Sequence, residues 1–266
     1  MSPPMDFKTI RYSVNGAVAT LSLARPERLN ALNATVHAEI RDALSAVEEN
    51  SALRCLVVTG EGRAFCSGQD LSERIVTDDK PIDTGASLDR DYNPLVRRLV
   101  GFPIPTIAAV NGPAVGAGAN LALACDILLF ARSAYLQEAF ARIGLVPDAG
   151  GTWLLPRLVG LKRAIAMSLT AEQIPAEECQ RLGIAWKVFE DATFRDDVAK
   201  SAAMLAMGPT LAYRLMKRAL NASYENDLDA QLDLERDCQR EAGRSQDFRE
   251  GVKAFHEKRF PRFEGK

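Results

Sequence analysis

The segment VPDAGGTW, residues 146–153, places a carboxylate between a proline and a glycine pair. Asp148 has apolar neighbours on both sides, among them Val146 and Trp153. Removing a charge from water costs free energy unless a partner or a function compensates for it. A carboxylate with little contact with water has a raised pKa and is a better base towards carbon, so Asp148 is a candidate acid/base. The structural alternative is that Asp148 caps a helix that begins near Gly151.

Two further segments have the composition of oxyanion-binding loops. GRAFCSGQDL (62–71) follows the apolar run CLVVTG, and NGPAVGAGANLALACD (111–126) follows PTIAAV and leads into a helical pattern. A strand, a tight turn and a helix leave backbone N–H groups unpaired at the start of the helix. A ligand could approach these groups closely because the turn residues are small, namely Ser67, Gly68, Gly116, Ala117 and Gly118. The alternative is that both loops are only tight turns where chain segments cross.

Other chemistries fit these loops less well. Gly116 and Gly118 are not followed by the third glycine of a dinucleotide-binding loop, and no Lys-Ser/Thr pair follows as in a phosphate-binding loop. Cys66 could be a nucleophile, but neither of the two histidines, His37 and His256, is an evident base for it. A buried, unreactive thiol is the more ordinary state of a cysteine.

The elements around these loops can be predicted from periodicity. Alternating residues on both sides of Asn15-Gly16 predict a hairpin, and Asn33 is the expected N-cap of a helix over residues 34–50. CLVVTG, PTIAAV and DILLFA are expected to be buried strands, and residues 71–87 a polar loop that orders on binding. After Gly151 helical patterns dominate, with Pro175 expected in the first turn of a helix and Gly183 just beyond a helix end.

The composition indicates a globular protein that binds a small molecule. The 266 residues are 47% hydrophobic and 26% charged, and the formal net charge of −2 does not favour nucleic acid or an anionic membrane as a partner. Five scattered cysteines predict neither disulfides nor a metal site, which suits a reducing cytoplasm. Neither an export signal at MSPPMDF nor an apolar run of about 18 residues is apparent, so no membrane association is expected.

Taken together, five segments resemble the crotonase superfamily, also called the enoyl-CoA hydratase/isomerase family. They are LARPERLNAL (23–32), GRAFCSGQDL, NGPAVGAGANLALACDI, IGLVPDAGGTWLLPRLVG and REGVKAFHEKRFPRF (249–263), in the family's order and spacing. The resemblance implies an α/β fold with a crotonase-like ββα spiral core over residues 1–200 and a helical C-terminal trimerisation region over residues 201–266. It also implies acyl-CoA thioester substrates, a homotrimer or a dimer of trimers, and no cofactor, because coenzyme A is part of the substrate.

The resemblance also implies a set of site residues. Family members hold the thioester carbonyl between two backbone N–H groups, here those of Ser67 and Ala117, and one such donor is typically worth about 3 kcal/mol of barrier. Phe255 and Lys258 match residues that often reach the coenzyme A of an adjoining subunit. The implied substrate and coenzyme A contacts are Arg25, Arg28, Leu29, Ala64, Gly68, Asp70, Leu71, Tyr92, Gly116, Asn120, Phe140, Phe255 and Lys258.

The acid/base positions favour an isomerase over a hydratase. Where the family's hydratases have two catalytic glutamates, this chain has Asn120 and Phe140, which cannot exchange a proton at neutral pH. Glu138 lies two residues out of register and is interpreted as a pocket or ion-pairing residue, with a role as base as the alternative. Asp148 matches the catalytic aspartate of the family's dienoyl-CoA isomerases, and one base that moves a proton between two carbons is sufficient for a double-bond shift.

A narrower resemblance concerns one branch of the superfamily. YNPLVRRL (92–99) and LDLERDCQREAGRSQDFREGVKAFHEKR (232–259) are similar to the isomerases of aerobic phenylacetate degradation, which convert the ring epoxide of phenylacetyl-CoA to an oxepin and shift β,γ double bonds. The segment around Leu88, Tyr92 and Leu95 would close the acyl pocket. The alternatives are an enoyl-CoA hydratase of fatty-acid or aromatic-acid degradation, with Glu138 as the active carboxylate, and a vestigial relative that binds coenzyme A or RNA.

Overall fold

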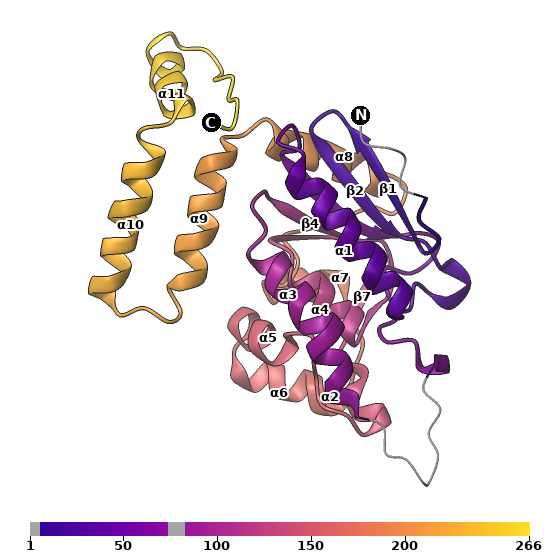
Figure 1. Ribbon diagram of the computed structural model, residues 1–266. Coiled ribbons are helices and arrows are strands. Elements are labelled where there is room, and N and C mark those ends of the chain that lie inside the picture. Colours follow the sequence, from indigo (N-terminus) through magenta and orange to yellow (C-terminus); the bar gives the residue numbers. More distant parts are fainter. Residues whose placement is uncertain (1–5, 74–82) are drawn as a thin grey trace.

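The computed structural model describes residues 6–73 and 83–266 (Figure 1). Its centre is a six-stranded sheet. The first two strands are antiparallel, and every later neighbour in the sheet is parallel. In spatial order the strands are β1 (Ile10–Asn15), β2 (Val18–Leu23), β3 (Cys55–Gly60), β4 (Thr106–Val110), β6 (Ile127–Ala131) and β9 (Lys187–Phe189). The hairpin and the three expected apolar strands are therefore confirmed, whereas β9 adds a strand in the part of the chain expected to be nearly all helical.

The N-terminal elements follow from local sequence rules. Gly16 begins the two-residue turn between β1 and β2 and has a φ of +58°, which favours glycine there. Helix α1 (Ala34–Glu49) begins after Asn33, whose side chain accepts a hydrogen bond from the Val36 N–H at 3.0 Å. The buried face of α1 packs against the hairpin, and its buried residues include Ile40 and Leu44.

A small three-stranded sheet lies beside the main one and brings distant loops together. It consists of β5 (Ala114–Val115), β7 (Tyr135–Gln137) and β8 (Ile174–Pro175). Helix α4 (Ala117–Leu123) follows β5 directly and is fully buried. Two further helices, α5 (Gly151–Val159) and α6 (Leu161–Thr170), pack on each other, and α5 contacts α4. The loop before α5 therefore lies next to α4.

The segment between β3 and β4 begins with the first glycine loop and becomes helical before β4. It contains α2 (Thr84–Ser87), a π-helical turn (Leu88–Tyr92) and α3 (Asn93–Val100). Tyr92 and Leu95 are buried and belong to the core. The polar loop expected over 71–87 is only partly described, because residues 74–82, and with them the expected ordering on binding, lie outside the described residues.

The C-terminal part is helical, as expected. Its helices are α7 (Ala176–Arg181), α8 (Phe194–Ala206), α9 (Thr210–Ala222), α10 (Leu228–Ala242) and α11 (Gln246–His256). Pro175 precedes α7 as its N-cap rather than lying in its first turn, and Gly183 follows the helix with a φ of +82°. In Figure 1, α9 and α10 stand side by side, away from the sheet, and α11 lies at their end.

The expected boundary at residue 200 falls inside α8. This helix packs on β2, β3 and β6, so it belongs to the core. The helical hairpin of α9 and α10 begins only after Gly208 and is attached to the core by Lys217, whose Nζ lies 2.7 Å from a carboxylate oxygen of Asp126. Within the described residues, no helix is long and apolar enough to span a membrane.

Candidate active site

The two glycine-rich loops lie against each other. The Phe65 and Cys66 N–H groups donate to the Pro113 carbonyl, each at 3.1 Å, and the Val115 N–H donates back to the Cys66 carbonyl at 2.9 Å. Gly118 fits between them because a Cβ at this position would lie 2.4 Å from the Cys66 carbonyl oxygen. The small residues of both loops are therefore needed where the two backbones touch.

Gly68 of the first loop lies close to Ala117 of the second. Gly68 has a φ of +91°, and a Cβ there would lie 3.4 Å from the Ala117 nitrogen. Ala117 is the first residue of α4, and within the described residues its N–H donates to no other group. This free N–H matches the donor expected at Ala117.

In this structure the Ser67 N–H is not free to be the oxyanion donor expected there. The Ser67 N–H donates to the Leu29 carbonyl at 2.9 Å, so it is already engaged. The neighbouring Gln69 N–H donates to no group in the described part of the chain. Its bridge to Leu32 is formed by the Gly68 carbonyl and the Asp70 N–H, which leaves the Gln69 N–H unused. The free donor on this loop is therefore that of Gln69.

Asp148 lies in the tight turn that starts α5. Gly150, with a φ of +82°, is the N-cap, and Ala149 also adopts the left-handed region with a φ of +47°, which is strained for an alanine. The Asp148 carbonyl accepts two hydrogen bonds at 2.8 Å, from the Gly151 N–H and from Nδ2 of Asn120. The Asp148 residue itself is half-buried.

The glycine pair after Asp148 has a specific packing role. A Cβ on Gly150 would lie 2.9 Å from Cγ1 of Val96, and a Cβ on Gly151 would lie 2.3 Å from Nδ2 of Asn120. Gly150 therefore lets the turn pack on α3, and Gly151 lets α5 approach α4 closely enough for Asn120 to hold the Asp148 carbonyl.

Glu138 joins this cluster as a second carboxyl group. It follows β7, it is only 1% exposed, and its Oε2 lies 3.4 Å from Nδ2 of Asn120. The pKa of Glu138 is raised to about 7, chiefly by burial; the hydrogen bond from Asn120 lowers it, and the charge of Asp148 contributes a smaller increase. From the sequence alone, Glu138 is expected to lie out of register with the catalytic position. The pairing of β7 with β5 brings Glu138 to α4, and these strands are too short for their apolar pattern to predict this pairing.

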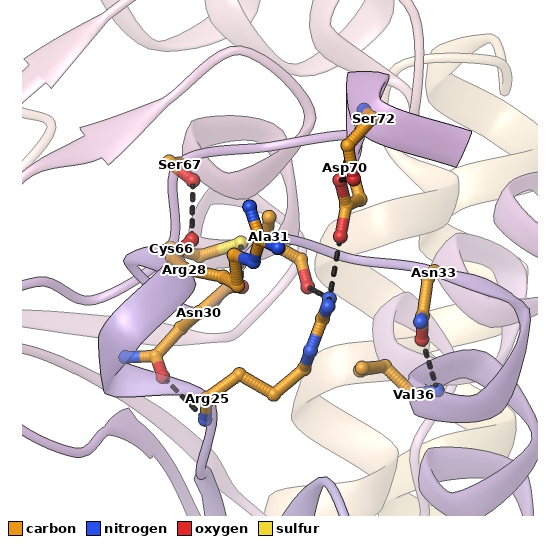
Figure 2. A network of polar contacts seen from close by, with 10 residues as sticks. All are labelled: Arg25, Arg28, Asn30, Ala31, Asn33, Val36, Cys66, Ser67, Asp70 and Ser72. Carbon is orange, nitrogen blue, oxygen red and sulfur yellow. Dashed lines mark hydrogen bonds and ion pairs between the residues drawn. The ribbon is translucent and has the colours of Figure 1, made fainter. Parts of the chain in front are cut away.

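Arg25 and Asp70, two of the expected coenzyme A contacts, form an ion pair with each other (Figure 2). One Nη of Arg25 lies 2.8 Å from Asp70 Oδ2, the other donates to the Ala31 carbonyl at 2.6 Å, and the Ser72 hydroxyl donates to Asp70 Oδ1 at 2.6 Å. The Ser72 and Arg25 hydrogen bonds hold the pKa of Asp70 below its usual value against the effect of burial. These two side chains thus fasten the first glycine loop to the N-terminal segment.

The other expected contacts are distributed over buried and exposed positions. Arg28 and Leu71 are exposed near the first loop, Leu29 is half-buried with a φ of +49°, and Ala64 is buried. Phe140 is buried, and its ring lies 3.8 Å from where a Cβ on Gly116 would be. Contact of any of these residues with coenzyme A stays a prediction.

Tyr92 supports the first loop from the core side. Its hydroxyl donates to Oε1 of Gln69 at 2.6 Å, and its ring makes an edge contact with the His37 ring at a centroid distance of 4.3 Å. Burial lowers the pKa of His37 to about 4, so this histidine is neutral at physiological pH. Cys66 is fully buried, and burial raises the pKa of its thiol to about 12, which leaves it unsuited to nucleophilic chemistry.

The two C-terminal residues of the expected site lie on the projecting helices. Phe255 is 81% exposed on α11, and Lys258 is exposed just beyond it. Neither residue joins the cluster around Asp148 within this one chain.

Within the described residues, no group of three His, Cys, Asp or Glu side chains is arranged to hold a metal ion. The chemistry available at the site is that of two carboxyl-bearing residues bound to Asn120 of α4, the helix that begins with the free N–H of Ala117. The fold is a parallel sheet with two glycine-rich loops, and the site combines free N–H groups with an asparagine that contacts both carboxyl-bearing residues. These features define an α/β protein of the crotonase class.

Comparison with known proteins agrees with this class. The family model for enoyl-CoA hydratase/isomerase matches residues 13–266, and the chain belongs to this family. It is 52% identical over 263 residues to the 1,2-epoxyphenylacetyl-CoA isomerase of Escherichia coli. The match covers 98% of this chain and 100% of that protein. A Rhodobacter capsulatus protein named "Probable enoyl-CoA hydratase" is 48% identical over 262 residues, with coverages of 98% and 100%.

A solved structure confirms the fold. The enoyl-CoA hydratase from Bacillus anthracis superimposes with a TM-score of 0.88 at 31% sequence identity, covering 97% of this chain and 100% of that one. The crotonase fold and the family expected from the sequence are therefore confirmed.

Proposed function

We propose that this enzyme is an isomerase of acyl-CoA thioesters in which Asp148 is the acid/base. The observation that carries the proposal is that Asn120 holds the Asp148 turn against α4, the helix whose first N–H group, that of Ala117, is free. A proton-transferring carboxylate and an oxyanion donor are thereby attached to one rigid element. Such rigid placement is what stabilises a charge that develops during a reaction.

The reaction proposed for a β,γ-unsaturated substrate is a proton transfer between two carbons. Asp148 takes a proton from the α carbon, and the electron pair of that C–H bond moves to the thioester oxygen as an enolate. The N–H groups of Ala117 and Gln69 donate hydrogen bonds to this oxygen. Protonated Asp148 then returns the proton to the γ carbon, so no atom is gained or lost.

For the substrate, we favour the ring epoxide of phenylacetyl-CoA. The support is the 52% identity to the 1,2-epoxyphenylacetyl-CoA isomerase over the full length of that protein. Formation of the oxepin breaks the carbon–carbon bond shared by the epoxide and the six-membered ring, and it needs neither water nor a cofactor. The acyl group would lie near Phe140, whose ring lies 3.8 Å from where a Cβ on Gly116 would be, beside the start of α4.

Hydration of an enoyl-CoA is the second candidate. Glu138 favours it, because a buried carboxyl group with a pKa of about 7 beside Asp148 resembles an acid/base pair. The relative from Rhodobacter capsulatus carries a hydratase name. In that case Glu138 would activate the water, although it is only 1% exposed in this structure.

The deciding experiment compares the wild type with Asp148→Asn on two substrates. We expect the wild type to isomerise a β,γ-unsaturated acyl-CoA, and the variant to lose at least about 100-fold in kcat while it still binds the CoA ester. Hydration of crotonyl-CoA is the control reaction. Rapid hydration by the wild type with no effect of Asp148→Asn would refute the isomerase proposal and favour Glu138 as the active group.

We further propose that the active form is a homotrimer or a dimer of trimers, located in the cytoplasm. The support for the oligomer is a set of exposed apolar side chains on α9, α10, α11 and the turn after α9: Met216, Leu220, Tyr224, Leu228, Leu232, Phe248, Val252 and Phe255. Exposed apolar patches of this extent mark contact surfaces. Light scattering of the purified protein measures the number of subunits, and Leu220→Asp with Leu232→Asp is expected to reduce it. The support for the cytoplasm is that the five cysteines are free thiols, the state that a reducing compartment maintains.

A further inference from the structure

The carboxyl group of Glu138 lacks the partners that a buried negative charge requires. Among the described residues, its carboxyl group has one hydrogen bond, the 3.4 Å contact between Oε2 and Nδ2 of Asn120. Its Oε1 is buried and accepts no hydrogen bond from the described residues, and the same holds for Oδ1 of Asn120. An ionised Glu138 offers no hydrogen-bond donor to either of these two acceptor oxygens, whereas a protonated Glu138 carries one O–H group. The arrangement is therefore better satisfied with a proton on Glu138.

The charged groups around Glu138 do not compensate for a negative charge there. Asp148 is the charged residue that acts on it. On the same segment, the Arg142 guanidinium donates to the Ala171 carbonyl at 2.9 Å, and the Gln137 amide donates to that carbonyl at 2.7 Å. Helix α4 carries no charged residue in AGANLAL.

In the part of the chain that the structure describes, α5 and α6 place no cation at Glu138 either. On α5, Arg157 stacks over the Trp153 ring at 3.9 Å, and on α6 Lys162 and Arg163 are exposed to solvent. Two ionised carboxyl groups in one poorly hydrated site repel each other, so one of them keeps its proton. Glu138, which is the more buried of the two, is the one that keeps it.

We propose that Glu138 is a positioning residue that keeps its proton beside Asp148, so that the pair of carboxyl groups has one negative charge, located on Asp148. The proposal rests on the proposed role of Asp148 as the base. Neutral Glu138 leaves Asp148 ionised and able to accept a proton from carbon. When Glu138 ionises, a second negative charge appears in the same site and opposes the formation of the enolate.

Infrared titration tests the proton directly and without any substrate. The wild type is titrated from about pH 5 to about pH 9, a range above the ordinary pKa of a carboxyl group, and the band of protonated carboxyl groups is followed. We expect a band that disappears near neutral pH, that is absent in Glu138→Gln, and that persists in Asp148→Asn with a lower midpoint, because the repelling charge is gone. Glu172→Gln, at an exposed carboxylate near Ala171, is the matched control and should leave the band in place.

The rate measurement tests the functional consequence. The kcat of the wild type should fall by about tenfold per pH unit above the midpoint of the infrared band, and this fall should be absent in Glu138→Gln. The proposal is overturned if the wild type has no band that disappears in Glu138→Gln. It is also overturned if Asp148→Asn leaves the midpoint of that band unchanged. Failure of the role of Asp148 appears separately, as full isomerase activity of Asp148→Asn, whatever the infrared result.

Discussion

Gly151 packs directly on the side-chain amide of Asn120. A Cβ at position 151 would lie 2.3 Å from Nδ2 of Asn120, and this Nδ2 is the group that donates to the Asp148 carbonyl at 2.8 Å. The glycine thus fixes the distance between the helix that carries Ala117 and the turn that carries Asp148.

The variant Gly151→Ala should therefore lose both stability and activity. The added methyl group must displace Asn120, and overfilling a packed site typically costs about 1–3 kcal/mol. Urea denaturation and the isomerase assay measure the two effects. Gly251→Ala on α11 is the matched control, because its Cβ would meet Phe263 only at 3.6 Å, and alanine favours a helix by roughly 0.5–1 kcal/mol over glycine. Equal behaviour of the two variants would contradict the packing role of Gly151.

The variant Ala117→Pro should remove one oxyanion donor with little effect on the fold. Ala117 is the first residue of α4, where proline is tolerated and where its missing N–H breaks no helical bond. We expect kcat to fall by about 100- to 1000-fold. Ala117→Gly keeps the N–H and should keep most of the activity, and circular dichroism checks that both variants are folded. Undiminished turnover by Ala117→Pro would exclude this N–H as a donor.

The Arg25–Asp70 ion pair should make stability depend on pH in the acidic range. The pKa of Asp70 is lower in the folded chain than in the unfolded one, so its contribution is complete above the unfolded value of about 3.9 and is lost as the pH falls through the folded value. At neutral pH, Asp70→Asn should cost about 1.5–3 kcal/mol, the range for hydrogen bonds to charged groups. The difference from the wild type should shrink below about pH 4. Asp233→Asn, at an exposed ion pair, should change stability little at any pH.

His37 should destabilise the fold at acidic pH. Its pKa falls from the usual value of about 6.5 to about 4 in the folded chain, so the unfolded chain binds the proton more strongly. Stability is therefore complete above about pH 6.5 and decreases as the pH falls towards 4, by about 3 kcal/mol in total. His37→Phe keeps a ring against Tyr92 and should remove this part of the pH dependence. Urea midpoints between these two pH values measure it, and identical slopes for both proteins would speak against a buried neutral histidine.

Much of the local structure could be predicted because it depends on neighbours in the chain. The cap at Asn33, the turn at Gly16 and the helix start at Gly151 each follow from steric and hydrogen-bonding rules over a few residues. The apolar runs of β3, β4 and β6 follow from burial on both faces of a parallel sheet. By contrast, β9 is a short strand of three residues and carries too little pattern to be found in this way.

The sequence by itself determined the family, the glycine-rich loops and Asp148 as a candidate base, since these depend on residue type and order. Only the tertiary structure decided that the Ser67 N–H is taken by the Leu29 carbonyl and that Gln69 has the free donor. It also decided that Glu138 and Asp148 meet at Asn120, which lies 18 residues from the first and 28 from the second. The reason is physical: a free N–H group, or a carboxyl group that keeps its proton, is defined by what the folded chain places next to it, and those neighbours come from distant segments.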